Sequence, residues 1–225
     1  LKNKFGAGGF GKPVFRGTFN SAFHIAKSPL LPVVVGTNRI IIGSDNGLTA
    51  AAVIGQRDAF GRVNVLADPH VAEGDSMGYD RFLRTIIIPK LEEMRIPRRH
   101  VTFVVDPACF HRSEATETTI AQVIAAEGFE VLPSPTNKPE RCISSAEGLF
   151  MQQVNGESLL RISPTCTHLA AALEWGYRNK RLTTGQSSPT PEKNHFSHIA
   201  DGFTAFCLHF NNPGANIRQS VARPE

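Results

Sequence analysis

The sequence predicts an α/β fold built on one mixed β-sheet with helices on both faces. Three short apolar runs, at 39–44, 49–56 and 62–67, are separated by turn residues and predict three antiparallel strands in a row. From residue 79 onward, helical periods of apolar residues alternate with short β-branched runs. That alternation is typical of βαβ units, whose crossover helices cover both faces of a sheet.

Local signals place the individual elements. The first two strands form a hairpin around a turn at Asp45, Asn46 and Gly47. The elements predicted after the third strand are, in order, a helix over 79–94 that Pro97 ends, a strand over 101–105, a helix over about 115–126, a strand over 129–132, a helix over 140–154, a strand over 159–162, a helix over 168–177 and a helix over 197–210. The last helix is apolar nearly all round, so it should be buried on more than one side. The polar residues at 179–194 predict a mobile loop.

Length and composition favour one folded domain. The chain has 225 residues, of which 41% are hydrophobic, which is enough for one buried core. We divide it into an N-terminal linker or strap over 1–38, the folded domain over 39–210 and a flexible C-terminal tail over 211–225. The chain begins with Leu1 and its opening stretch lacks periodicity, so we expect a piece of a longer protein.

Composition also argues against several classes of protein. No apolar run approaches the roughly 18 residues that span a bilayer, and the first residues are polar and glycine-rich, unlike a signal peptide. We therefore expect a soluble protein that is not secreted. Cys109, Cys142, Cys166 and Cys207 lie singly, which favours reduced thiols of a cytosolic protein, with disulfides as the alternative. The formal net charge of +4 permits nucleic-acid binding without requiring it.

A glycine-rich pattern near the N-terminus imitates a nucleotide-binding loop. Residues 6–12 match both G-x-G-x-x-G and G-x-x-x-x-G-K. A true phosphate-binding loop follows a strand and opens a helix. No strand is predicted before Gly6, and Pro13 stands where a Ser or Thr would hold Mg²⁺. We therefore reject this interpretation.

Three aspartates lie at the ends of predicted core elements. Asp45 follows the first strand, Asp106 follows the strand over 101–105, and Asp201 lies near the start of the last helix. Each also has a purely structural interpretation, respectively as a hairpin-turn residue, a helix-entry acid and a charge near a helix N-terminus.

Asp201 is the most informative of the three. An ionised carboxylate on a helix that is apolar nearly all round is costly unless a cation or a hydrogen-bond donor compensates it. A divalent cation would also offset the repulsion between converging carboxylates. An all-oxygen ligand set suits Mg²⁺ or Mn²⁺ and argues against zinc. Two such ions about 4 Å apart can activate water and stabilise the leaving oxygen of a phosphodiester. The sequence alone leaves open whether the three side chains meet.

Several short segments occur in an order that is typical of one protein family. They are Gly43-Ser44-Asp45-Asn46-Gly47 followed by 51–56, Val104-Val105-Asp106-Pro107-Ala108, and His198-Ile199-Ala200-Asp201-Gly202, with 162–166 and 173–177 between them and 11–24 upstream. Their order and spacing resemble the C-terminal nuclease domain of the large terminase subunit of tailed bacteriophages, a member of the ribonuclease H-like superfamily. The similarity covers nearly the whole chain.

The resemblance implies a ribonuclease H-like mixed β-sheet over 39–210 and a metal-dependent endonuclease. In that family the enzyme cuts concatemeric double-stranded DNA during viral genome packaging. By position, Asp45, Asp106 and Asp201 would be the catalytic carboxylates and would bind two Mg²⁺ or Mn²⁺ ions. The resemblance also implies an upstream ATPase motor domain of the same polypeptide. Further implied partners are the portal and the small terminase subunit, with no membrane, in the host cell cytoplasm.

Other polar residues are candidates for supporting roles. His198 lies three residues before Asp201, on the same helix face, and could orient a carboxylate or a phosphate, or merely cap the helix start. The basic residues that we place along a DNA path, with a solvated surface as the alternative, are Lys138, Arg141, Arg178, Lys180 and Arg181. The loop over 179–194 could gate that path. The sequence leaves open whether Asp68, Asp75 or Glu174 assists.

One departure and two alternatives remain. The family's final motif usually continues with Ala and an aromatic or basic residue, whereas this chain has Gly202, Phe203 and Thr204, which predicts a looser helix start. A junction resolvase or an integrase-type nuclease shares the carboxylate scaffold and is the alternative enzyme. A non-catalytic DNA-binding or assembly module is the alternative that lacks turnover.

Overall fold

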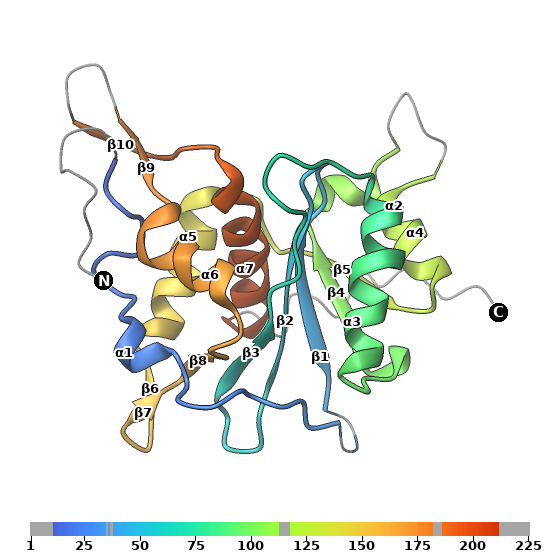
Figure 1. The fold of residues 1–225 in the computed structure, drawn as a ribbon, viewed down its shortest axis with the longest axis horizontal. Helices are drawn as coiled ribbons and strands as arrows, with labels where there is room; N and C mark the ends of the chain where they lie inside the picture. The colour runs from blue at the N-terminus through green and yellow to red at the C-terminus, as the bar shows by residue number, and fades with distance from the viewer. Residues whose placement is uncertain (1–10, 35, 37, 113–117, 182–185, 212–225) are drawn as a thin grey trace.

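A six-stranded mixed sheet forms the centre of the molecule (Figure 1). The structure is a computed structural model that describes residues 11–34, 36, 38–112, 118–181 and 186–211. Across the sheet the strands are β5 (Glu130–Pro133), β4 (Val101–Val105), β1 (Ile40–Asp45), β2 (Ala51–Arg57), β3 (Val63–Ala67) and β8 (Leu160–Ile162). Most of the glycine-rich pattern at 6–12 and nearly all of the predicted tail lie outside the described residues.

The strand directions confirm the predicted mixed sheet. β1 pairs antiparallel with β2, and β2 pairs antiparallel with β3. β4 joins β1 in parallel, β5 joins β4 in parallel, and β8 joins β3 in parallel. Because β1 and β4 are parallel neighbours at the centre, their carboxyl ends meet at one edge of the sheet.

Helices cover both faces of the sheet. One face carries α5 (Pro139–Phe150), α6 (Thr167–Ala171) with its π-helical continuation (Ala172–Gly176), and α7 (His195–Asn211). The other carries α2 (Tyr79–Phe82), a π-helical segment (Leu83–Ile87), α3 (Ile88–Glu93) and α4 (Ile120–Ala126). Among the described residues, no helix combines the length and apolar content needed to cross a membrane.

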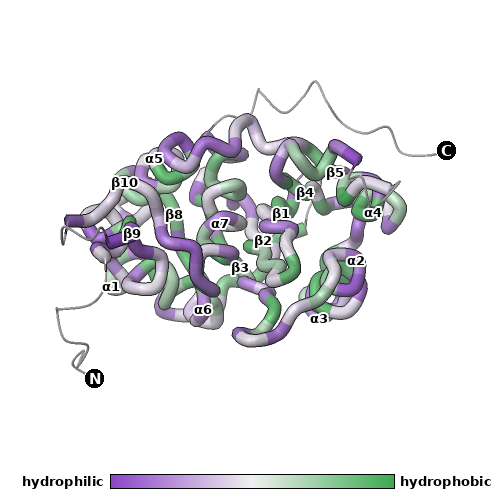
Figure 2. Tube along the Cα trace, turned by 90° about the horizontal axis from the view of Figure 1, so that it is seen from above, coloured by the Kyte–Doolittle hydropathy of each residue, from purple (hydrophilic) through white to green (hydrophobic). Residues whose placement is uncertain are grey.

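The two cores follow from the alternation of side chains along the central strands. Ile41 of β1 and Val104 of β4 pack toward α7, whereas Ile40 and Ile42 pack toward the helices of the opposite face. A strand that is buried on both faces carries no polar alternation, which is why β1 and β4 are nearly continuous apolar runs. Figure 2 shows these apolar stretches of chain between the two helical layers.

The predicted helix over 79–94 contains a π-helical segment. That wider turn, Leu83–Ile87, lies between α2 and α3 and immediately precedes Pro89 in the first turn of α3. Proline lacks an N–H and its ring clashes with the carbonyl four residues earlier in a regular helix. The widened turn provides room for that ring, so the helix continues to Glu93.

Two other predicted boundaries were wrong. The helix predicted over 140–154 ends at Phe150, and β6 (Gln153–Val154) pairs antiparallel with β7 (Glu157–Ser158). Asn155 and Gly156 join these strands, both with positive φ, which is the hairpin turn that an Asn-Gly pair favours. The helix predicted from about 115 begins at Ile120, because Thr119 and Gln122 form a capping box, and residues 113–117 lie outside the described part.

The loop predicted over 179–194 is also wrong for the described residues. β9 (Asn179–Arg181) and β10 (Ser187–Pro191) pair antiparallel and form a hairpin beside the N-terminal end of α7. The strands are short and polar, so hydrophobic periodicity could not reveal them. Their backbone hydrogen bonds, together with an isolated bridge from Pro13 to Arg178, form without core-facing side chains.

The segment before β1 contributes to the core. Phe15 is fully buried against Phe150, Tyr177 and Phe203, and α1 (Ser21–His24) follows it. The segment then joins the edge of the sheet, where Ile25 forms a parallel bridge with Ile162. The predicted linker therefore supplies at least one large core side chain.

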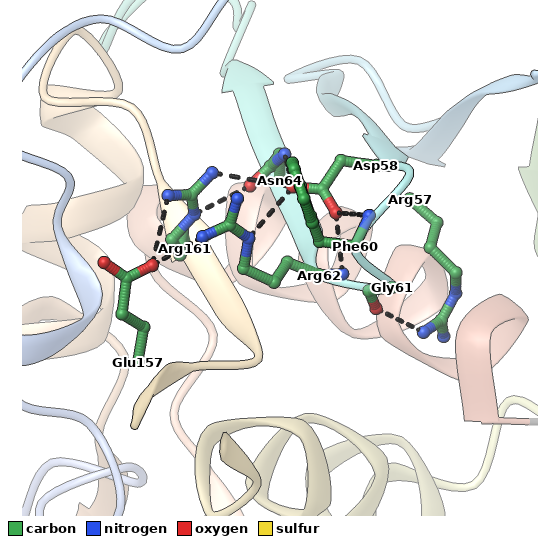
Figure 3. Close-up of polar contacts among 8 residues, drawn as sticks. All are labelled: Arg57, Asp58, Phe60, Gly61, Arg62, Asn64, Glu157 and Arg161. Atoms are coloured by element: carbon green, nitrogen blue, oxygen red, sulfur yellow. Dashed lines mark hydrogen bonds and ion pairs between the residues drawn. The ribbon is translucent and has the colours of Figure 1, made fainter. Parts of the chain in front are cut away.

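A polar network fixes the end of the sheet farthest from the β1 carboxyl end (Figure 3). The Asp58 carboxylate accepts hydrogen bonds from the Arg62 backbone and side chain and from Asn64. Burial alone would raise the pKa of Asp58, but these hydrogen bonds outweigh it and hold the pKa below its usual value. Arg161 of β8 donates to Asn64 and pairs with Glu157, so the network ties β8 to β3.

Replacing Phe15 with alanine should destabilise the protein by about 3–5 kcal/mol, because it removes a fully buried aromatic ring. Phe23→Ala is the matched control, since Phe23 is 41% exposed, and it should cost much less. Urea denaturation of both variants measures the difference. Equal costs would show that the segment before β1 is only a linker.

Candidate metal centre

Asp45 and Asp106 lie at the ends of two neighbouring parallel strands. Ser44 pairs with Val105 in the register of β1 and β4, so each aspartate is the next residue beyond that pair. Side chains alternate along a strand, and Ile41 and Val104 both face α7. Asp45 and Asp106 therefore share that face at the carboxyl edge of the sheet.

Two glycines bring the third aspartate to this edge. A Cβ atom at Gly43 would lie 2.3 Å from the Gly202 carbonyl oxygen and 2.5 Å from the Phe206 nitrogen, so the α7 backbone rests directly on β1. A Cβ atom at Gly202 would lie 3.1 Å from the Gly43 carbonyl oxygen, closer than an alanine tolerates without a shift. Gly202 thus permits a tight contact, and the predicted looser helix start was wrong. Asp201 precedes this contact.

The three aspartates line one cavity of about 270 Å³. They come from different elements, namely β1, the residue after β4, and the second turn of α7. The other lining residues are Ser44, Ser134, Thr136, Asn137, Pro139, Cys142, Tyr177, Thr190, Pro191, Lys193, Thr204 and Ala205. The structure therefore brings Asp45, Asp106 and Asp201 together at one site.

His198 holds the Asp45 carboxylate. Its Nδ1 lies 2.7 Å from Asp45 Oδ2, and its Nε2 lies 2.7 Å from Thr49 Oγ1. Both contacts are satisfied when the Thr49 hydroxyl donates to Nε2 and Nδ1–H donates to Asp45. The helix-cap alternative is wrong, because α7 begins at His195 and Asn194 accepts from the first backbone N–H groups.

Asp106 combines the two interpretations that the sequence left open. Its Oδ1 accepts a hydrogen bond of 2.7 Å from the Ala108 backbone N–H, at the start of the short 3₁₀ helix Pro107–Phe110. It is therefore a helix-entry acid and a cavity-lining carboxylate at once. The backbone contact engages one oxygen and fixes the side chain's orientation.

Asp201 is less buried than the apolar helix suggested, and it already has a cationic partner. Its side chain is 33% exposed, and Lys193 Nζ donates to its Oδ2 at 2.6 Å. Burial raises the pKa of Asp201, and although Lys193 opposes this effect, the pKa stays above its usual value. The compensating cation that we inferred from the sequence is, in this structure, a lysine.

The donor set of the cavity fits a hard divalent cation. Carboxylate oxygens from Asp45, Asp106 and Asp201 are the ligands that Mg²⁺ and Mn²⁺ prefer. Within the described parts of the chain, however, no group of three or more His, Cys, Asp or Glu side chains is arranged to hold an ion as it stands. The ligand chemistry fits, and cation binding requires the side chains to move closer.

Sequence reasoning missed two polar neighbours of this site. Lys193 lies in the predicted loop, and Tyr177 ends the π-helical continuation of α6. Burial, followed by the charge of Asp201, raises the pKa of the Tyr177 hydroxyl, which therefore remains protonated. Burial also raises the pKa of Cys142 to about 11, so this thiol is not a nucleophile at neutral pH. All four cysteines are free thiols.

The basic residues predicted along a DNA path occupy two places. Lys138 and Arg141 are exposed at the start of α5, next to the cavity-lining residues 136–142. Arg178 pairs with Glu192 at 3.1 Å, while Lys180 and Arg181 are exposed on β9. The acids whose role the sequence left open, Asp68, Asp75 and Glu174, do not line the cavity among the described residues.

Histidines pack beside the first turn of α7. The rings of His70 and His168 stack with centroids 3.9 Å apart, and His168 also stacks on Phe196. Burial lowers the pKa of His168 to about 4, with smaller contributions from His70 and His195, so it is neutral at physiological pH. These rings therefore act as packing groups that support α7 rather than as charges.

Solved structures with the same fold are nuclease domains of phage large terminases. The large terminase of one thermophilic bacteriophage, in complex with ADP, matches with a TM-score of 0.63 at 13% identity. The match covers 90% of this chain and 45% of that one, so the chain spans less than half of that protein. The large terminase nuclease from thermophilic phage G20c, with bound magnesium, matches with a TM-score of 0.53 at 16% identity, over 89% and 97% of the two chains.

The P22 large terminase nuclease domain matches with a TM-score of 0.54 at 12% identity, over 88% of this chain and 90% of that one. No protein-family model and no curated protein matches the sequence. At these identities the matches establish the fold, which is the ribonuclease H-like fold of large terminase nuclease domains. The resemblance predicted from the sequence is confirmed at that level.

Gly43→Ala should destabilise the protein by about 1–3 kcal/mol, because the new methyl group would push α7 away from β1. Gly47→Ala is the matched control, since a Cβ atom there meets nothing within 4 Å. Chemical denaturation compares the two variants. A Gly43 variant as stable as the Gly47 variant would contradict the close contact between α7 and β1.

Proposed function

We propose that this chain is the nuclease part of a phage large terminase and cuts double-stranded DNA in a metal-dependent reaction. The observation that carries the proposal is the convergence of Asp45, Asp106 and Asp201 in one cavity at the carboxyl edge of the sheet. The fold supports it, because solved structures that share this fold are large terminase nucleases, one of them with bound magnesium.

In this proposal the three aspartates hold two Mg²⁺ or Mn²⁺ ions. When bound, such ions activate a water molecule and stabilise the leaving oxygen of the phosphodiester. The chain's own groups position the ligands. His198 keeps the Asp45 carboxylate directed into the cavity, and the Ala108 backbone N–H does the same for Asp106. Because each contact engages one carboxylate oxygen, the other is left for a cation.

The proposed substrate is concatemeric double-stranded DNA. The exposed residues Lys138 and Arg141 on α5 and Lys180 and Arg181 on β9 supply positive charge near the cavity, and Arg178 anchors the hairpin. Lysine and arginine contacts to phosphates give affinity without sequence preference. The β9–β10 hairpin is placed to control access to the cavity, which is lined by Thr190 and Pro191 of β10.

The whole protein is proposed to be larger than this chain. An ATPase motor domain would precede it in the same polypeptide, and the portal and the small terminase subunit would bind the assembled machine in the host cytoplasm. The match to less than half of the ADP-bound large terminase supports an additional domain. Within the chain, 39–210 would be the nuclease domain, with 1–38 as the strap and 211–225 as the tail.

Asp106→Asn should lower the rate of DNA cleavage at least about 100-fold while leaving DNA binding within about twofold, because it removes a metal ligand and not a basic contact. Asp75→Asn is the control, since Asp75 is exposed and does not line the cavity. The assay follows plasmid cleavage with Mn²⁺ and with EDTA, beside a DNA-binding titration. Normal cleavage by the Asp106 variant would remove that residue from the site.

The same assay separates the alternatives. A junction resolvase would require branched DNA, whereas a packaging nuclease should cut linear and supercoiled duplexes. A DNA-binding or assembly module would bind DNA without cutting it. Cleavage that persists in EDTA, or that is absent with Mn²⁺, would contradict the metal-dependent mechanism.

A further inference from the structure

Lys193 places an ammonium group inside the candidate metal centre. It lies in the connection between β10 and α7, and its Nζ donates to Asp201 Oδ2 at 2.6 Å. It lines the cavity together with Asp45 and Asp106. Of the described residues around this cavity, Lys193 is the only basic one, so a single positive charge faces three carboxylates.

The residues on either side hold the backbone of Lys193 in place. The Glu192 backbone N–H donates to the Arg178 carbonyl oxygen at 2.8 Å, and its carboxylate pairs with the Arg178 guanidinium at 3.1 Å. On the other side, Asn194 Oδ1 accepts from the backbone N–H groups of Phe196 and Ser197 at the start of α7. The backbone is thus anchored, and the position of the ammonium depends on the flexible side chain.

The contact between Lys193 and Asp201 is well suited to exchange. The Lys193 side chain is 77% exposed, so water screens the pair and its net stabilisation is small. Burial by itself would lower the pKa of Lys193, but the hydrogen bond and the charge of Asp201 outweigh it and raise the pKa, so the group is charged. A divalent cation carries twice the charge and contacts several carboxylates at once, so it should bind Asp201 more strongly than the ammonium does.

We infer that Lys193 and a divalent cation compete for the Asp201 carboxylate, so that cation binding releases the lysine. This inference rests on the proposed function, because it takes Asp201 to be a metal ligand. It agrees with the arrangement of the described side chains, in which Asp201 is engaged by Lys193 and no three-ligand group is formed. The released ammonium stays tethered beside the cavity, where it can bind a phosphate oxygen of the substrate.

Isothermal titration of Mn²⁺ into wild type and Lys193→Gln, at one pH and low salt, tests the competition. Removing the competing charge should tighten Mn²⁺ binding by about three- to tenfold. Lys193→Arg keeps the charge and should stay within about twofold of wild type. Lys90→Gln is the matched control, because Lys90 pairs with Glu93 at 2.8 Å on α3, among residues that do not line the cavity, and it should bind Mn²⁺ as wild type does.

The outcomes separate this inference from the proposed function. If wild type binds Mn²⁺ and Lys193→Gln binds it equally or more weakly, the competition is wrong while the metal centre stands. If Lys90→Gln tightens binding as much as Lys193→Gln does, the effect is one of general charge and the competition is again wrong. If wild type does not bind Mn²⁺ at all, both the competition and the metal centre are wrong.

Discussion

The contact between the backbones of β1 and α7 is the constraint on which the site depends. Gly43 and Gly202 remove the side chains that would otherwise separate a strand from a helix, so the helix lies directly on the strand. This contact places Asp201 beside Asp45, and the parallel pairing of β1 with β4 adds Asp106. The centre is therefore assembled from rigid elements, which is how a site keeps its ligands in position.

Electrostatics explains the other groups around the cavity. Three carboxylates that face one another repel, and each has a compensating partner. Asp45 is bound by His198, Asp106 by a backbone N–H, and Asp201 by Lys193. The first two contacts restrain orientation and leave an oxygen available. The third supplies a full positive charge at the place where a cation would act.

The sequence predicted the sheet and the aspartates because both produce periodic or positional signals. Apolar runs marked β1 and β4, and strand ends marked Asp45 and Asp106. Periodicity could not reveal the β9–β10 hairpin, whose polar strands face no core, and it therefore missed Lys193 beside it. The turn at Asn155 and Gly156 did carry a hairpin signal, which the apolar run before it concealed. The role of Gly202 depends on a tertiary contact that one sequence does not encode locally.

The most direct test of the account is to locate bound Mn²⁺ by anomalous diffraction from crystals of the protein. The account predicts manganese peaks in the cavity, within about 2.5 Å of carboxylate oxygens of Asp45, Asp106 and Asp201. Manganese bound elsewhere, for example at His70 and His168, with no peak between the three aspartates, would contradict it. That result would leave the fold intact and remove its proposed chemistry.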